Sequence, residues 1–455
     1  MDRHEEDAEA AIRPLDLELA GWLYGYTRRY AAKRNALVLL VVVRSMQLAA
    51  LAWAMGEIIN GPVARHSVSG LAWGVAAFAA MSLLTQLSFH FRQRLALELG
   101  EAVVHDLRND IFIHLQRMRM SFFDRTRLGR IISRTTSDAE AVRAGVQDVL
   151  FSSLVGLGQM LAAAGLMLWY DAVLFSIVAA MGPVLWSINR HFRGRLSQAH
   201  RDIQESFSRV TSSLAESVNG IRVTQAFVRQ ETNRRKFQAL LADHSRCSMQ
   251  AARTAGVFLP LLDLNSQFFL AALLTVGGYR ALSPEIAMPV GDLIRFFFLA
   301  NLFFHPIQAL GDQYNQALVS MAGAERVRAL LNTPADWSDP PAARRPSRLC
   351  GQVRFDQVSF EYRPGRRVLD EVSFVAEPGE TIALVGQTGS GKTSIVNLIA
   401  KFYLPTSGRL SIDGHEIREL SSDWLHERMG IVLQQNFLFT GSVLDNIRVG
   451  RPDAD

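Results

Sequence analysis

Residues 70–89, GLAWGVAAFAAMSLLTQLSF, decide the fold, because this long stretch contains no charged side chain. About 20 helical residues extend over roughly 30 Å, which is the thickness of the hydrocarbon core of a bilayer. A buried helix in a large soluble core is the alternative. An uncharged run of this length favours a membrane span instead.

Five further stretches share this apolar character. The expected spans are 36–58, 70–90, 146–169, 172–192, 256–279 and 290–310. The composition agrees, because 49% of the 455 residues are hydrophobic and the mean hydropathy is +0.10 although 20% of the residues are charged. Apolar and charged residues must therefore be segregated along the chain. This composition excludes a disordered chain and, with Cys247 and Cys350 as the only cysteines, a small disulfide scaffold.

The connections between the spans predict the orientation. The segments 91–145 and 190–255 are long, helical in pattern and rich in arginine, whereas the other connections are short. Basic residues favour the cytoplasmic side of a membrane. We therefore expect both segments, the N-terminus and the C-terminal part on the cytoplasmic side of a bacterial inner (plasma) membrane. The net charge of only +5 indicates no nucleic-acid partner.

Residues 1–35 are expected to form a cytoplasmic N-terminal segment before the first span. Within it, residues 14–31 place apolar side chains at helical spacing. Both a helix lying on the inner leaflet and a cytosolic helix packed against its neighbours fit this pattern.

The composition changes after a membrane domain that we place at 36–331. Residues 332–350 are rich in proline and charge, as expected of a linker. The domain that follows, 351–455, shows the apolar patterns of strands between glycine and proline turns. The expected strands are 353–362, 368–377 and 381–386.

A phosphate-binding motif lies in this second domain. The residues Gly386, Gln387, Thr388, Gly389, Ser390, Gly391, Lys392 and Thr393 fit the pattern G-x-x-x-x-G-K-[ST]. We expect a buried strand, 381–385, to enter this loop and a helix, 393–403, to leave it. The glycines let backbone N–H groups approach phosphate oxygens, and the helix N-terminus adds partial positive charge. Lys392 is then expected to reach the β- and γ-phosphates, and the Thr393 hydroxyl to bind Mg²⁺. A glycine turn beside a structural lysine is the plainer alternative.

The chain resembles the half-transporters of ATP-binding-cassette (ABC) exporters over essentially its whole length from about residue 20. The shared features are six spans, two long inner loops and a downstream phosphate loop. SFFDRTRLGRIISRTTSDAEAV at 121–142 and LAESVNGIRVTQAF at 214–227 are similar to segments of the family's inner loops. Pro306 and AERVRALL at 324–331 match span six and the exit helix. The resemblance implies an all-α polytopic membrane domain of six transmembrane helices with long cytoplasmic extensions, followed by a partial P-loop α/β nucleotide-binding domain.

The resemblance also assigns roles to single residues. Tyr362, in VSFEY, is similar to the residue that stacks on adenine, although an ordinary strand tyrosine is the alternative. Gln434, in MGIVLQQNFLF, aligns with the glutamine that contacts Mg²⁺ and the attacking water, and the adjacent Gln435 leaves the register open. Ser394 would donate to the α-phosphate. ATP and Mg²⁺ are thus the implied cofactors, with Thr393 and Gln434 at the metal.

The implied function is ATP-driven export by alternating access, as an ATP hydrolase coupled to transport. The implied partners are a second half-transporter, as homodimer or heterodimer, the lipid bilayer and a hydrophobic or lipid-like substrate. The family's signature segment, Asp-Glu catalytic base and switch histidine do not occur in this sequence, so we expect a truncated cassette that is inactive alone. A non-hydrolysing remnant, or a membrane subunit that needs an intact partner cassette, is the alternative. A P-loop kinase or GTPase with a membrane anchor would need only one span.

Arg44 and Asp263 are charged residues that lie well inside expected spans. A charge near the bilayer centre costs about 2.5–3.5 kcal/mol on insertion scales, so such side chains face protein or water. They either line a substrate cavity or lie at the headgroup level, and the sequence leaves both options open.

Overall fold

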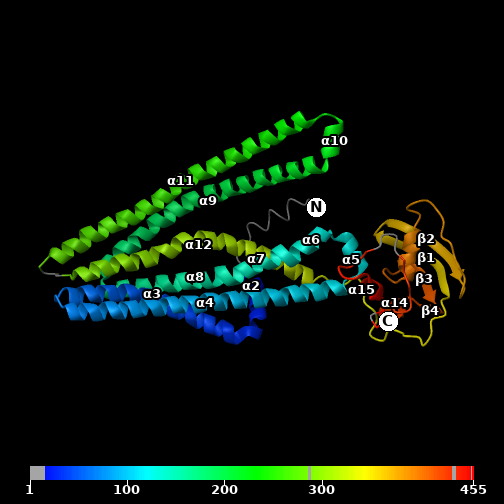
Figure 1. Cartoon of the computed structure of the whole chain (residues 1–455), viewed down its shortest axis with the longest axis horizontal. Coiled ribbons are helices and arrows are strands. Elements are labelled where there is room, and N and C mark those ends of the chain that lie inside the picture. The colour runs from blue at the N-terminus through cyan, green and yellow to red at the C-terminus, as the bar shows by residue number, and fades with distance from the viewer. Residues whose placement is uncertain (1–15, 285–287, 433–436, 452, 455) are drawn as a thin grey trace. The chain divides into compact units, whose positions relative to one another are not determined.

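The structure, a computed structural model, describes residues 16–284, 288–432, 437–451 and 453–454 (Figure 1). The chain divides into two compact units. Unit 1 comprises Met1–His105 and Glu140–Ala322, and unit 2 comprises Asp106–Ala139 and Gly323–Asp455.

Helices dominate the first three quarters of the chain. They are α2 (Leu17–Tyr26), α3 (Ala31–Ile58), α4 (Val68–Arg117), α5 (Met120–Arg125), α6 (Leu128–Ser133), α7 (Ala139–Ala144), α8 (Phe151–Tyr170), α9 (Ala172–Asn219), α10 (Ile221–Ala226), α11 (Gln230–Leu282) and α12 (Val290–Leu331). Short π-helical or 3₁₀ turns join several of them. The arginine-rich segments are helical as expected, because α4, α9 and α11 continue well beyond their apolar parts.

Five helical stretches within the described residues are long and apolar enough to cross a membrane. They are Glu18–Val63, Val68–Arg117, Leu128–Tyr170, Ala172–Asn219 and Val290–Ile307. Each holds or overlaps one expected span. The remaining expected span, 256–279, lies in α11, where the described part Gln267–Leu282 is a shorter apolar helix. The expected all-α membrane domain is confirmed.

Unit 1 has an apolar core to which several long helices contribute. Its buried side chains include Ala49 from α3, Met167 from α8, Leu174 from α9, Leu273 from α11 and Phe296 from α12. Each helix thus buries one stripe against its neighbours. The opposite faces expose large apolar side chains, as expected for surfaces that meet lipid.

The junction between α8 and α9 shows how the sequence sets a helix boundary. Asp171 accepts hydrogen bonds from the backbone N–H groups of Val173 and Leu174, at 2.8 and 3.1 Å. This N-cap starts α9 directly after α8 ends at Tyr170. The second carboxylate oxygen of Asp171 pairs with Arg280 of α11 at 2.8 Å.

Two arginines within the apolar helices, Arg44 and Arg295, contact other parts of the protein. Arg44 donates to the backbone carbonyl of Thr85 on α4 at 2.6 Å, and its guanidinium lies 5.0 Å from the Phe89 ring centre. The sequence pattern did not single out Arg295, which is 1% exposed and pairs with Glu57 at 2.8 Å. Asp263 lies in α11, but its side chain is outside the described residues.

Unit 2 contains a four-stranded antiparallel sheet in the order β2-β1-β3-β4. Its elements are β1 (Val353–Arg363), β2 (Arg366–Ala376), α13 (Lys392–Ile399), β3 (Ser407–Ile412), β4 (His415–Glu416), α14 (Ser422–His426) and α15 (Val443–Arg448). Phe355 of β1 stacks on Phe374 of β2 with ring centres 4.6 Å apart. α13 contributes the buried side chain of Leu398 to the core that covers this sheet. The first two expected strands are confirmed.

The third expected strand is wrong for the described structure. Residues 381–385 form no strand, and Val385 is 88% exposed. A strand forms only when its backbone groups pair with a neighbour, and none of the described strands pairs with this segment. The helix after the loop is also shorter than 393–403. It ends at Ile399, and Lys401 adopts a left-handed φ of 54°.

Candidate nucleotide-binding site

The phosphate loop leads directly into α13. Gly391, the N-cap residue of α13, has a φ of 90°. A Cβ atom there would lie 2.6 Å from Cδ2 of Leu369 and 3.2 Å from the backbone oxygen of Val368. Only glycine therefore fits without moving the backbone of β2.

Lys392 lies at the centre of this loop. Its ammonium donates to the backbone carbonyls of Gly386 and Gln387 at 2.8 and 2.7 Å, and it lies 3.4 Å from Oγ of Ser390. Residues 386–390 are exposed, so the loop wraps its own lysine at a surface open to solvent. Phosphate oxygens would form stronger, charge-assisted bonds with this ammonium than the carbonyls do.

The other loop residues fit the same ligand. Gln387, Thr388, Gly389 and Ser390 are exposed, and Thr393 is exposed on the first turn of α13. A hydroxyl at this place can serve as a Mg²⁺ ligand. The described residues contain no group of three or more His, Cys, Asp or Glu that could hold a metal ion by themselves. Nucleotide phosphates would therefore have to supply further oxygen ligands.

The structure brings two further predicted site residues together. Ser394 is buried, and its hydroxyl lies 3.1 Å from the Tyr362 hydroxyl. Asn397 donates to Tyr362 at 3.4 Å. The Tyr362 ring packs edge-on against Phe360 and Tyr403. Tyr362 is thus half-buried against α13, and the expected adenine contact stays a prediction. Gln434 and Gln435 lie outside the described residues.

A buried ion pair follows α13. Lys401 is 1% exposed, and its ammonium donates to Asp339 Oδ1 at 2.8 Å and to the backbone carbonyl of Leu420. Asp339 also accepts from the backbone N–H and hydroxyl of Ser422, at 2.7 and 2.8 Å. Burial lowers the pKa of the Lys401 ammonium, and the Asp339 carboxylate offsets part of that effect. Burial raises the pKa of Asp339, but the bonds from Lys401 and Ser422 outweigh it and hold the pKa below its usual value.

Trp337, two residues before Asp339, connects this pair to the segment before α5. The Arg119 guanidinium stacks 3.8 Å from the Trp337 ring centre, and its Nε donates to the Trp337 carbonyl at 3.2 Å. Lys401 lies 5.3 Å from the centre of the same ring. The Trp337 ring therefore contacts two cations, Arg119 from the first inner loop and Lys401 from beyond the end of the phosphate-loop helix.

A second contact joins the same two segments. The Tyr403 hydroxyl donates to the Asp124 carboxylate of α5. Burial, and after it this carboxylate, raises the pKa of the Tyr403 hydroxyl above its usual value. Asp124 belongs to the SFFD motif of the first inner loop. Trp337, Lys401 and Tyr403 fit no phosphate-loop pattern, so the sequence did not identify them.

The family models match both parts of the chain. The model described as "ABC transporter transmembrane region" matches residues 35–307, more than half of the chain. The model described as "ABC transporter" matches residues 369–454, which include the whole phosphate loop. The chain belongs to the ABC transporter family. It fuses the membrane region and the ATP-binding region of that family in one polypeptide.

Curated relatives of this ABC transporter include two Bacillus subtilis proteins, the ABC transporter ATP-binding proteins YknV and YfiC. YknV is 34% identical over 78% of the chain and 59% of its own length, and YfiC is 29% identical over 93% and 71%. The fatty acid ABC transporter ATP-binding/permease protein of Mycobacterium bovis is 31% identical over 76% of the chain and 54% of its own length. The chain thus spans between 54% and 71% of the length of these relatives.

Proposed function

We propose that this ABC transporter is one half of an ATP-driven exporter. One observation carries the proposal. A membrane domain and a phosphate loop, in which Lys392 lies among exposed backbone groups, occur in family order in one chain. The relatives' names support a hydrophobic or lipid-like substrate, because one of them is named for fatty acids.

The proposed roles in the cassette are as follows. Residues 386–391 cradle the phosphates of ATP, and Lys392 neutralises the β- and γ-phosphate charge. Thr393, together with Gln434, holds the Mg²⁺ that ATP brings. Tyr362 offers its ring to adenine, and Ser394 binds the α-phosphate. The metal neutralises charge that develops during phosphoryl transfer, and these residues fix the geometry of the reaction.

We propose that the end of α13 transmits the state of the loop to the membrane domain. Lys401 and Tyr403 lie just beyond α13, and they contact Trp337 and Asp124. A shift of α13 on ATP binding would therefore move the first inner loop through contacts that already exist. Such a route requires that ATP bind one arrangement of these contacts better than another.

Two half-transporters, identical or different, would alternate between inward-open and outward-open states.

The proposed domains are a cytoplasmic segment 1–35, a membrane domain 36–331, a linker 332–350 and a cassette portion 351–455. We place the inner loops 91–145 and 190–255 and the cassette on the cytoplasmic side of the bacterial inner membrane. Catalytic turnover by these 455 residues alone is not part of the proposal, because the chain spans only 59% of the length of YknV and 54% of the length of the Mycobacterium bovis relative.

Transport in inside-out membrane vesicles tests both the function and the orientation. ATP added outside such vesicles reaches the cassette only if the cassette is cytoplasmic. Accumulation of a fluorescent long-chain lipid analogue should require ATP and should not occur with a non-hydrolysable ATP analogue. Right-side-out vesicles should show no effect of external ATP. Accumulation without ATP would contradict the proposed function, and ATP-driven transport by right-side-out vesicles would contradict the orientation.

A further inference from the structure

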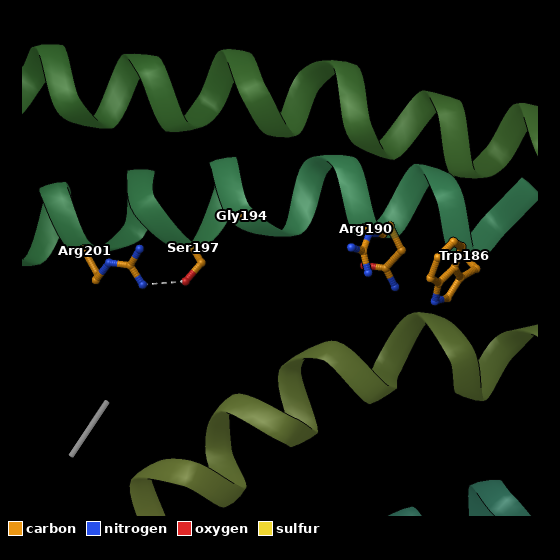
Figure 2. Close-up of a pocket in the computed structure, with 6 residues that line it drawn as sticks. Trp186, Arg190, Gly194, Ser197 and Arg201 are labelled. Atoms are coloured by element: carbon orange, nitrogen blue, oxygen red, sulfur yellow. Dashed lines mark hydrogen bonds between the residues drawn. The ribbon is translucent and has the colours of Figure 1, made fainter. Parts of the chain in front are cut away.

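A hollow lies along one face of α9, outside the nucleotide site. Six residues line a cavity of about 510 Å³: Trp186, Asn189, Arg190, Gly194, Ser197 and Arg201. Most of them are three or four residues apart, so they share one side of the helix. Figure 2 shows the labelled side chains on the side of α9 that is turned away from α11.

The middle of this hollow is empty because of Gly194. A Cβ atom placed there would meet no other atom within 4 Å. Trp186 lies near one end of the hollow and Arg201 at the other (Figure 2). The cavity has the volume of many small-molecule sites, which are roughly 300–1,000 Å³.

The two arginines in the hollow have no acidic partner among the described residues. Arg201 donates to two neutral acceptors, Ser197 Oγ at 3.0 Å and Gln198 Oε1 at 2.7 Å. The Arg190 guanidinium lies 5.2 Å from the Trp186 ring centre, and it forms no ion pair within the described part of the chain. Two guanidinium groups facing an open cavity favour an anionic ligand, because arginine binds carboxylate and phosphate oxygens through paired N–H donors.

Trp186 adds an apolar requirement. Its side chain is 64% exposed and lies near the end of the apolar part of α9. Tryptophan is enriched where a membrane meets water, and arginine at such depths extends its charged end toward water. The hollow therefore offers an apolar surface on the membrane side and cationic groups beyond it.

We infer that this hollow binds an anionic amphiphile, with its carboxylate or phosphate headgroup between Arg190 and Arg201 and its apolar chain along Trp186. Arg190 and Arg201 would each donate N–H groups to the headgroup, and Ser197 would contribute its hydroxyl. Gly194, between the two arginines, leaves the space that the headgroup needs. The claim that the protein exports this amphiphile rests on the proposed function. The claim that the hollow binds it does not.

Binding to the purified full-length protein in neutral detergent, without nucleotide, tests the inference. The probes are dodecanoate, dodecyl phosphate and the uncharged dodecanol. We expect the two anions to bind and dodecanol to bind about tenfold more weakly or less. If dodecanoate alone binds, the headgroup is a carboxylate; if dodecyl phosphate alone binds, it is a phosphate. Equal affinity for dodecanol would overturn the inference.

Two variants with a matched control place the ligand. The Arg190→Gln/Arg201→Gln double variant should lower anion affinity at least about tenfold, because it removes the charge and keeps polar side chains. Gly194→Phe should abolish binding by filling the hollow. Gly256→Phe should not, because Gly256 of α11 also has no atom within 4 Å of a new Cβ but does not line the cavity. Equal binding by Gly194→Phe and Gly256→Phe would refute the site.

Transport in vesicles separates this inference from the proposed function. One possible result is that the protein binds neither anion and that Gly194→Phe does not affect ATP-driven export. This result would refute the site and leave the proposed function intact. The opposite result is that Gly194→Phe abolishes anion binding but ATP drives no movement of any probe. This result would support the site and refute the proposed function.

Discussion

Lys392→Ala is expected to reduce ATP hydrolysis by the full-length protein by at least about 10²-fold, because it removes a charge that faces the phosphates in the transition state. The stability of unit 2 should change little. The alanine frees only the exposed carbonyls of Gly386 and Gln387, which water can satisfy. Steady-state phosphate release from protein in lipid vesicles measures the first effect, and protease resistance in urea measures the second.

The control for this loss is Arg354→Ala. Arg354 is an exposed cation of β1 in the same unit, and its removal should leave hydrolysis unchanged. Hydrolysis by Lys392→Ala within a factor of a few of the unmodified protein would show that the loop does not hold the reacting phosphates. A parallel loss of hydrolysis and of stability would show that Lys392 acts only on folding.

Lys401→Met is expected to have the largest effect on stability. It leaves the half-buried Asp339 carboxylate without its cation, and breaking a buried pair costs about 3–5 kcal/mol in free energy of unfolding. The Ser422 hydrogen bonds to Asp339 remain, so we expect about 3 kcal/mol. The measurement is the urea midpoint of protease cleavage in unit 2.

A double-mutant cycle isolates the pair. The Lys401→Met/Asp339→Asn variant should be less destabilised than the sum of its single variants, because neither charge is then left unpaired. Arg409→Met, an exposed substitution on β3 of the same unit, should change the unfolding free energy by no more than about 0.5 kcal/mol. Additive effects in the cycle, or equal effects of Lys401→Met and Arg409→Met, would contradict the account of this pair.

Local patterns in the sequence were enough to predict the membrane helices. A long uncharged run such as 70–89 is stable in a bilayer as a helix, because a helix forms all its backbone hydrogen bonds internally, whatever its neighbours are. The phosphate-loop pattern likewise places glycine at positions 386 and 391, and both residues have positive φ angles in the structure, 155° and 90°.

Features that depend on distant partners could not be predicted in this way. The run 381–385 has strand composition, but a strand also needs a pairing neighbour, and the described strands provide none. Lys401 looks like a surface residue until Asp339, 62 positions earlier in the chain, is brought to it. Trp337 lies in a linker whose composition gave no sign of contact with Arg119. Arg190 and Arg201 looked like ordinary basic residues of an inner loop.

The central claim is that nucleotide at the phosphate loop acts on the first inner loop through the end of α13. Hydrogen exchange of the α5 amides, Met120–Arg125, measured with and without Mg-ATP, tests it most directly. The account predicts that ATP changes exchange in α5 severalfold in the full-length protein and not in Lys392→Ala. In Tyr403→Phe, which removes the hydroxyl that binds Asp124, ATP should protect residues 386–391 but affect α5 less. Protection of residues 386–391 by ATP with no change in α5 exchange in the unmodified protein would contradict the claim.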